Sequence, residues 1–152
     1  MTEGPRHNED ERMEEYLEGL YKLQEAEGLC RTKRMSTELG VSQASVTEML
    51  ERLAAQGYII YSPRRGAKLT QKGLREGRRV TRKHRLLEVF LHDKLGIDKR
   101  KVHREACRME HSISDEIEGK LIVFLNSPTK CPDDNRSIPY ERPSVKGKVV
   151  PR

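Results

Sequence analysis

Apolar residues recur at steps of three and four near the start of the chain, which predicts an amphipathic helix over residues 8–26. They are Met13, Tyr16, Leu17, Leu20, Tyr21 and Leu23. A short helical run, TKRMSTEL, follows, and GVS then leads into QASVTEMLERLAAQ. Because Ser42 is a suitable N-cap and Gly57 a suitable stop, these segments predict a helix-turn-helix.

The pattern changes after Gly57. In YIIYSPRRGAKLT, β-branched and aromatic residues flank a PRRG turn, as in a small two-stranded hairpin. A helix-turn-helix followed by a basic hairpin indicates a winged helix. Neither part alone is sufficient, because isolated helix-turn-helix patterns give many false positives.

Three further helices are predicted in the second half of the chain. Thr70 can cap a long helix over residues 71–95, which Gly96 closes. Asp98 caps the next helix, and Ser112 or Ser114 begins the last, DEIEGKLIVFLN. Five of the seven prolines lie from residue 127 onward, which predicts an extended or partly disordered arm.

The predicted fold is therefore mainly α. Residues 1–75 are predicted to form a winged helix with a small two-stranded β wing, and residues 76–126 are predicted to form an all-helical domain. Residues 127–152 form a proline-rich C-terminal arm. With 152 residues, the chain has room for one ordinary domain, or a small domain and an arm.

Charge is distributed unevenly along the chain. Residues 1–30 hold three Lys or Arg and nine Asp or Glu, a net charge of −6. Residues 64–104 hold fifteen Lys or Arg and four Asp or Glu, a net charge of +11. A basic region of this kind is typical of a surface that binds a polyanion, and a merely solvated surface is the alternative.

No apolar run approaches the ~20 residues that cross a bilayer, and the acidic N-terminus lacks an apolar signal core, so we expect a cytoplasmic protein. The three cysteines, Cys30, Cys107 and Cys131, are widely spaced and odd in number. They are expected to be free thiols or metal ligands rather than a disulfide framework, with Cys131 a surface thiol.

The segment HREACRMEH concentrates potential metal ligands. On a helix, Cys107, Glu110 and His111 lie at about 40°, −20° and 80° from His103, so all four share one face. Glu105 points away. Thiolate, carboxylate and imidazole from adjacent turns can converge on one ion.

Two further pairs of residues can join this face. His84 and Glu88 lie at i and i+4 and can meet His103, because the short LGID connection makes their helices antiparallel. Glu15 and Glu18 lie at i and i+3 on the first helix. An isolated histidine, His/Glu pair or cysteine is usually structural, but these ligand types sharing one face favour metal binding.

Catalysis has less support. The chain lacks an HExxH motif, a nucleophile elbow and an anion-binding glycine-rich loop. We therefore expect a protein that is not an enzyme and that does not act on a small organic substrate.

The order of these features resembles the diphtheria toxin repressor and manganese transport regulator family of metal-dependent repressors, over about residues 10–125. The resemblance rests on H-x3-C-x2-E-H-x2-S-D, with KH-x4-E about one helix upstream. It implies a primary site of Cys107, Glu110 and His111 with a first-helix residue. It implies an ancillary site of His84, Glu88 and His103.

The first helix combines two branches of that family. Where iron-responsive members often have methionine before the tyrosine, this chain has Glu15, and acids at Glu15 and Glu18 are typical of manganese-responsive members. Because the Cys107 thiolate disfavours Mn(II), we predict Fe(II), with Mn(II) as the alternative and Co(II), Ni(II) or Zn(II) as surrogates. Many iron-type members add a C-terminal barrel that supplies ancillary ligands, and the arm here is too short to form one.

The expected function is repression of metal homeostasis genes by a homodimer on palindromic double-stranded operator DNA. Residues 76–126 would thus form a helical dimerisation and metal-binding domain, with the dimer interface on the apolar faces of residues 113–124 and neighbouring helices. Metal would bridge the first helix to this domain. The expected DNA-binding residues are Arg31, Lys33, Arg34, Ser42, Gln43, Ser45, Thr47, Arg64 and Arg65. A metal-independent winged-helix regulator is the competing interpretation.

Overall fold

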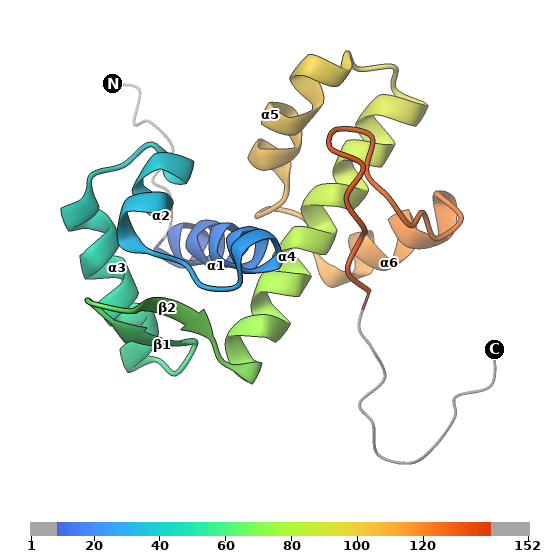
Figure 1. Ribbon diagram of the computed structural model, residues 1–152. Helices are drawn as coiled ribbons and strands as arrows, with labels where there is room; N and C mark the ends of the chain where they lie inside the picture. The colour runs from blue at the N-terminus through green and yellow to red at the C-terminus, as the bar shows by residue number, and fades with distance from the viewer. Residues whose placement is uncertain (1–8, 141–152) are drawn as a thin grey trace, which may run out of the picture.

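The computed structural model describes residues 9–140, which form two lobes joined by a long central helix (Figure 1). The first lobe contains α1 (Glu9–Glu27), α2 (Thr32–Leu39), α3 (Gln43–Ala55), β1 (Ile59–Ser62) and β2 (Gly66–Leu69). The central helix is α4 (Gln71–Val89), and the second lobe contains η1 (Phe90–Lys94), α5 (Lys99–Met109) and α6 (Asp115–Phe124). The predicted fold class, a winged helix followed by a helical region, is confirmed.

Side-chain caps start the helices where the sequence predicts. Ser42 accepts a hydrogen bond from the Ser45 amide, and Thr70 accepts one from the Gly73 amide. Asp98 caps α5, and Ser114 rather than Ser112 caps α6. These hydroxyl and carboxylate groups satisfy amides that have no partner inside the helix.

The wing is an antiparallel hairpin in which Ile59 pairs with Leu69 and Ser62 with Gly66. Cys30 extends it by exchanging backbone hydrogen bonds with Ala67. Gly66 has a φ of +101°, and a Cβ there would lie 2.4 Å from the Cys30 carbonyl oxygen, so only glycine fits. The wing is thereby attached to the segment that precedes α2.

One continuous apolar core fills the first lobe. Its fully buried members include Met35, Val46, Leu50 and Leu53, packed beneath Leu17 and Leu20 of α1. α1 then packs across α4 at Gly77, where a Cβ would lie 3.0 Å from that of Tyr21. α1 thus belongs to the first lobe while it lies against the helix that enters the second.

The second lobe has two small apolar cores instead of one. Leu86, Val89, Leu125 and Ile138 form the first. Leu87, Leu91, Val102 and Ala106 form the second, and Phe90 and Leu121 pack against both. Charged side chains that include Glu18, His84 and Glu110 are buried between α1, α4 and α5.

Two predictions for this lobe were incomplete. The helix expected over residues 71–95 ends as a regular α-helix at Val89 and continues as the π-helical turn η1, with Gly96 at positive φ.

The predicted arm is not extended up to residue 140, because it folds back along α4 (Figure 1). Ile138 is buried, and Arg85 donates a hydrogen bond to the Ser137 carbonyl. The rest of the predicted arm, residues 141–152, lies outside the described residues.

Within residues 9–140, no helix is long and apolar enough to span a membrane.

Candidate metal centre

Charged side chains from three helices meet where α1 crosses α4 and α5 lies alongside. Glu18 comes from α1, His84 and Glu88 come from α4, and Glu110 follows α5. Each of these four residues is at most 5% exposed. Burying a charged group costs free energy unless the group is paired or binds a metal, so a cluster of four such side chains needs compensating charges or a bound ion.

Glu18, His84 and Glu110 form the most enclosed group. Their ligand atoms lie within 4.8 Å of one another. His84 Nδ1 donates a hydrogen bond to Glu110 Oε2 at 2.5 Å and lies 3.7 Å from Glu18 Oε1. Two carboxylates and an imidazole at this separation are a suitable partial ligand set for a first-row divalent metal.

A second group lies on the other side of the His84 ring. His84 Nε2 donates to Glu88 Oε1 at 2.8 Å, and His103 Nδ1 lies 3.1 Å from the same oxygen. The structure therefore brings together all three residues expected at the ancillary site. The folded-back arm adds Asp133, whose Oδ2 lies 3.7 Å from His103 Nδ1.

Cys107 lies beside both groups. Its Sγ is 3.6 Å from His103 Nε2 and 3.9 Å from His84 Nδ1. Cys107 also lines a cavity of about 260 Å³ together with Glu15, Glu18 and Glu110. The sulfur thus faces the space that the first-helix carboxylates face.

His111 is placed differently from the helical geometry that the sequence suggested. α5 ends at Met109, so His111 lies in the turn that follows. Its Nδ1 donates to Glu14 Oε2 at 3.0 Å, and its Nε2 lies 3.1 Å from Glu110 Oε1. Among residues 9–140, the His111 ring is therefore adjacent to Glu110 but is not grouped with Cys107.

Glu14, which sequence reasoning missed, contacts His111, whereas Glu15 lines the cavity with Glu18, Cys107 and Glu110. Among residues 9–140, neither Glu14 nor Glu15 belongs to a group of three ligand atoms that lie within 4.8 Å of one another. Glu14 and Glu18 lie one turn apart on α1, so they also share a face. No sequence signal distinguishes Glu14 from its neighbour, because either spacing to Glu18 is helical.

The charges in the cluster alter one another's protonation. Burial and the nearby Glu110 raise the pKa of Glu18 to about 7. Burial opposes the ionised form of Glu110 as well, but hydrogen bonds from His111 and His84 hold its pKa well below the usual range. Hydrogen bonds to Cys107 and Glu88 raise the pKa of His103 to about 10.

The Cys107 thiol shows the same electrostatic environment. Burial raises its pKa, but hydrogen bonds with His103 and His84 have the larger combined effect and lower the pKa to about 7. A thiol with this pKa is about half ionised at pH 7, and the thiolate is the form that binds metal.

Two buried atoms indicate that the charge cluster is incompletely satisfied by protein alone. Glu18 Oε1 and His111 Nε2 are buried and form no well-directed hydrogen bond within the described chain. Both belong to ligand-type side chains that border Glu110. The donor set of carboxylate, imidazole and thiolate therefore fits a divalent metal ion.

Of the other two cysteines, Cys30 lies away from these donors, whereas Cys131 lies in the folded-back arm near Asp133 and Glu88. Cys30 is buried beneath the wing, and burial raises its pKa to about 11. Cys131 was expected at the surface but is 2% exposed, because the arm folds back and its thiol donates to Asp134. All three cysteines are free thiols.

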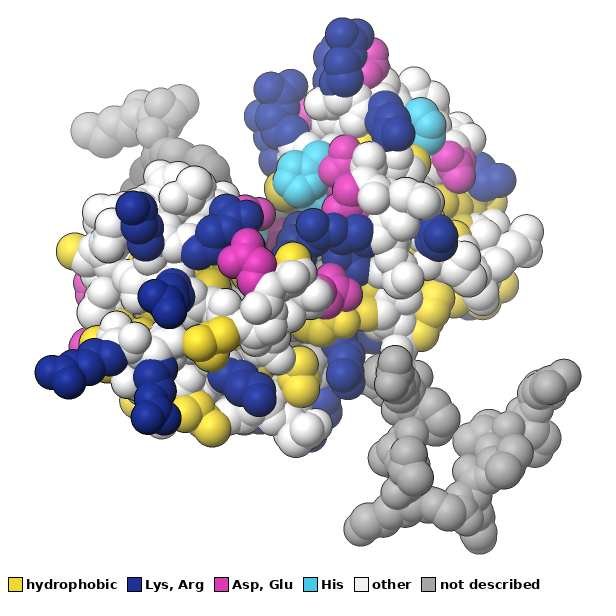
Figure 2. Space-filling view, viewed as in Figure 1, with side chains coloured by type: hydrophobic (Ala, Val, Ile, Leu, Met, Phe, Trp, Pro, Cys, Tyr) yellow, Lys and Arg dark blue, Asp and Glu magenta, His cyan; other side chains and the backbone are white. Residues whose placement is uncertain are grey.

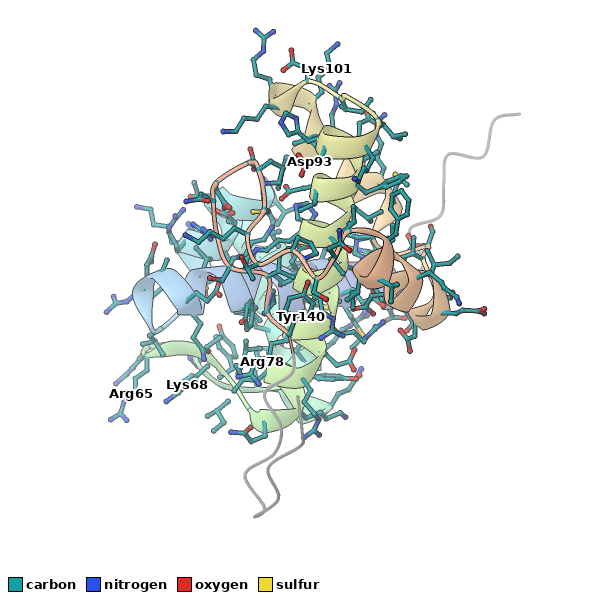
Figure 3. The ribbon with its side chains drawn as sticks, turned by 90° about the vertical axis from the view of Figure 1, so that its right-hand side faces the viewer. Arg65, Lys68, Arg78, Asp93, Lys101 and Tyr140 are labelled. Atoms are coloured by element: carbon teal, nitrogen blue, oxygen red, sulfur yellow. The ribbon has the colours of Figure 1, made fainter. Side chains whose placement is uncertain are left out.

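The expected DNA-binding residues lie on the first lobe. Arg31, Lys33, Gln43, Arg64 and Arg65 are exposed. Figure 2 shows Lys and Arg side chains spread over this lobe, and in Figure 3 Arg65 and Lys68 point outward from the wing. Lys68, which sequence reasoning missed, is exposed on the same hairpin.

Several of these polar residues already have partners inside the chain. Ser42 and Ser45 hydrogen-bond each other, and the Thr47 hydroxyl donates to the Gln43 carbonyl. Arg34 forms ion pairs with Glu27 and Glu38. Arg31, Lys33 and the two arginines of the wing are thus freer than Arg34 to contact a DNA backbone, since none of them forms an ion pair within residues 9–140.

Comparison with known proteins gives the same two-part division. Residues 10–67 match "Iron dependent repressor, N-terminal DNA binding domain", and residues 70–139 match "Iron dependent repressor, metal binding and dimerisation domain". A helix-turn-helix-type transcriptional regulator of Methanocaldococcus jannaschii is 35% identical over 114 residues, which cover 74% of this chain and 91% of that protein.

Two other relatives are named as repressors. The diphtheria toxin repressor of Corynebacterium efficiens is 39% identical over 123 residues, 80% of this chain and 53% of the repressor. This chain thus spans about half of that protein's length. A manganese-dependent transcriptional repressor solved in complex with manganese is 30% identical, with a TM-score of 0.76 over 92% of this chain and 62% of that one. From these matches over both lobes, the chain belongs to the iron-dependent repressor family of metal-dependent transcriptional regulators.

Proposed function

We propose that this chain represses transcription by binding palindromic operator DNA as a homodimer when it is loaded with a divalent metal. The observation that carries the proposal is the position of the charge cluster. Glu14 and Glu18 belong to the helix that forms part of the first lobe, whereas His84, Cys107 and Glu110 belong to the central helix and the second lobe. One cation bound between them would fix the first lobe relative to the second.

We propose Glu18, Cys107, Glu110 and His111 as the primary set, with Glu14 or Glu15 as the additional carboxylate. His84, Glu88 and His103 form the ancillary set. Its distances also support Asp133 as a member. A bound divalent ion supplies positive charge that offsets the buried carboxylates. The chain's own role is to hold the carboxylates of α1 against the donors of α4 and α5.

Fe(II) is the proposed metal. The Cys107 thiolate favours Fe(II), Co(II), Ni(II) or Zn(II) over Mn(II), whereas the carboxylates favour harder ions. Mn(II) is the alternative, and the matches to the iron-dependent repressor models and to a manganese-dependent repressor are consistent with both.

The domain division proposed from the sequence, at residues 75 and 126, places α4 mainly in the second domain.

The dimer surface is proposed on α6, where Ile117, Val123 and Phe124 are exposed apolar residues. Phe124 is 59% exposed, and such side chains gather at subunit interfaces. A C2 dimer would carry two winged helices to two half-sites.

The test begins with selection of bound sequences from a random duplex DNA pool, under anaerobic conditions with Fe(II). Affinity for the selected sequence is then measured with Fe(II), Mn(II), Zn(II) or a chelator, for wild type and Cys107→Ala. We expect metal to strengthen binding of wild type and Cys107→Ala to lose most of this gain with Fe(II). Equal affinity with and without metal would support the metal-independent regulator instead.

A further inference from the structure

We propose that Lys22 is a built-in counter-cation of the candidate metal centre, which holds Glu18 in the metal-free protein and must be displaced when metal binds. Lys22 would then set the metal concentration at which the protein responds. This inference rests on the proposed function, because it assumes that Glu18 is a metal ligand.

Lys22 reaches the centre from α1 itself. It lies one turn after Glu18, and its Nζ is 2.7 Å from Glu18 Oε1. That oxygen is the same buried atom that lacks a well-directed hydrogen bond. The contact therefore compensates charge, while the directional bonding capacity of the oxygen remains unused.

The pair differs from an ordinary surface ion pair. The side chains of Lys22 and Glu18 are 17% and 7% exposed, whereas those of Arg52 and Glu48, a pair of equal spacing on α3, are 47% and 70% exposed. A surface pair of this spacing contributes little because water screens it. Lys22 has given up most of its hydration to approach a buried carboxylate.

Lys22 interacts electrostatically with other groups of the centre besides Glu18. Burial lowers the pKa of Lys22, but Glu18, Glu110 and Cys107 together raise it above its usual value. These are three of the proposed metal ligands. The ammonium thus provides, in the metal-free protein, part of the positive charge that a metal ion would supply.

An ammonium and a divalent ion cannot use the same Glu18 oxygen at once. Lys22 has space to leave, because it lines two cavities: one contains Glu18, Cys107 and Glu110, and the other contains His84, Glu88 and Asp133. Its four-carbon stem is flexible, so the ammonium can turn away while α1 stays in place. Displacing it costs part of the binding free energy of the metal.

The test compares Lys22→Met, which removes the charge and keeps the apolar stem, with Lys22→Arg, which retains the charge. Affinity for Mn(II) and Co(II) is measured by competition with a fluorescent chelator. We expect Lys22→Met to bind about tenfold more tightly than wild type, because a nearby like charge has been removed. Lys22→Arg should remain closer to wild type.

Thermal unfolding gives a second measurement. Without metal, Lys22→Met should melt about 2 to 4 °C below wild type, because Glu18 and Glu110 lose a compensating charge. With saturating metal it should melt at or above the wild-type temperature. A purely structural role would lower the melting temperature in both states.

Arg108→Met is the matched control for net charge, because Arg108 lies on α5 with its side chain 66% exposed. It should leave metal affinity within about twofold of wild type. If Lys22→Met binds metal no more tightly than wild type, the inference is wrong. If wild type itself binds neither metal, the proposed function fails as well, so the two failures are distinguishable. Lys22→Gln repeats the comparison should the methionine variant not fold.

Discussion

The two lobes are stabilised by different means. The first has a single apolar core in which Met35, Val46, Leu50 and Leu53 are completely buried. The second has two small apolar cores with a buried charge cluster between α1, α4 and α5. Apolar burial needs no ligand, whereas buried carboxylates need a compensating cation. Metal should therefore act on the second lobe and on its junction with α1.

The largest expected effect is in the apolar core of the first lobe. Leu50→Ala should lower the free energy of unfolding by about 3 kcal/mol, because it leaves a cavity in a fully buried site. Urea unfolding followed by circular dichroism measures this change with and without metal. If saturating metal brought the free energy of unfolding of Leu50→Ala back to the value of wild type in the same metal, the proposed difference between the lobes would be contradicted.

The next effect concerns the charge cluster. In Glu18→Gln, the metal-dependent gain in stability should largely disappear; at a metal concentration 100 times Kd, this gain is about 2.7 kcal/mol for one site. Differential scanning fluorimetry with and without Mn(II) measures it. Glu48→Gln, on the exposed face of α3, is the control and should keep the full gain.

Glu18→Gln should also change how the stability of the metal-free protein depends on pH. Because the pKa of Glu18 is raised to about 7, the folded protein holds its proton more tightly than the unfolded chain. Stability from this group is therefore present below about pH 4.5 and is lost as the pH rises to about 7. Glu18→Gln should lack this decrease, and an unchanged pH profile would contradict the raised pKa.

A smaller effect is expected in the arm. Ile138→Ala should cost about 2 kcal/mol, because Ile138 packs against Leu86, Val89 and Leu125. Ile60→Ala, at a wing position that is 71% exposed, should change stability by less than about 0.5 kcal/mol. Equal effects for both variants would indicate that the arm does not pack in solution.

The smallest effect is on DNA binding through the wing. Arg65→Ala should weaken binding of the metal-loaded protein to DNA severalfold, whatever the DNA sequence. The slope of log affinity against log salt concentration should fall by about one, because one phosphate contact is lost, and metal affinity should stay unchanged. Fluorescence anisotropy over a range of salt concentrations measures this. An unchanged salt slope would exclude a phosphate contact by Arg65 and leave the metal-binding region unaffected.

Local patterns were sufficient for most of the fold. Hydrophobic spacing located α1, α2 and α3, and the PRRG turn located the hairpin. The caps at Ser42, Thr70 and Asp98 also followed from sequence, because capping depends on residues within one turn. The π-helical turn at the end of α4 gave no local signal.

The candidate metal centre was only partly accessible to this reasoning. The i, i+4 spacing of His84 and Glu88 identified one face, and antiparallel packing brought His103 to it. Glu14 was missed because the rotation of α1 against α4 depends on packing at Gly77. Asp133 and the burial of Cys131 were missed because they depend on where the arm folds.

The helices, the wing, the ligand-type residues and the basic region could be read from the sequence, since each depends on neighbours within one or two turns. Which residues share a site depends on the tertiary structure. α5 ends at Met109, which turns His111 toward Glu14, and the arm returns to place Asp133 beside His103. No sequence pattern singled out Lys22, and the crossing of α1 with α4 buries it against Glu18. The physical reason is that metal ligands must converge within a few ångströms, and this distance is set by how helices pack.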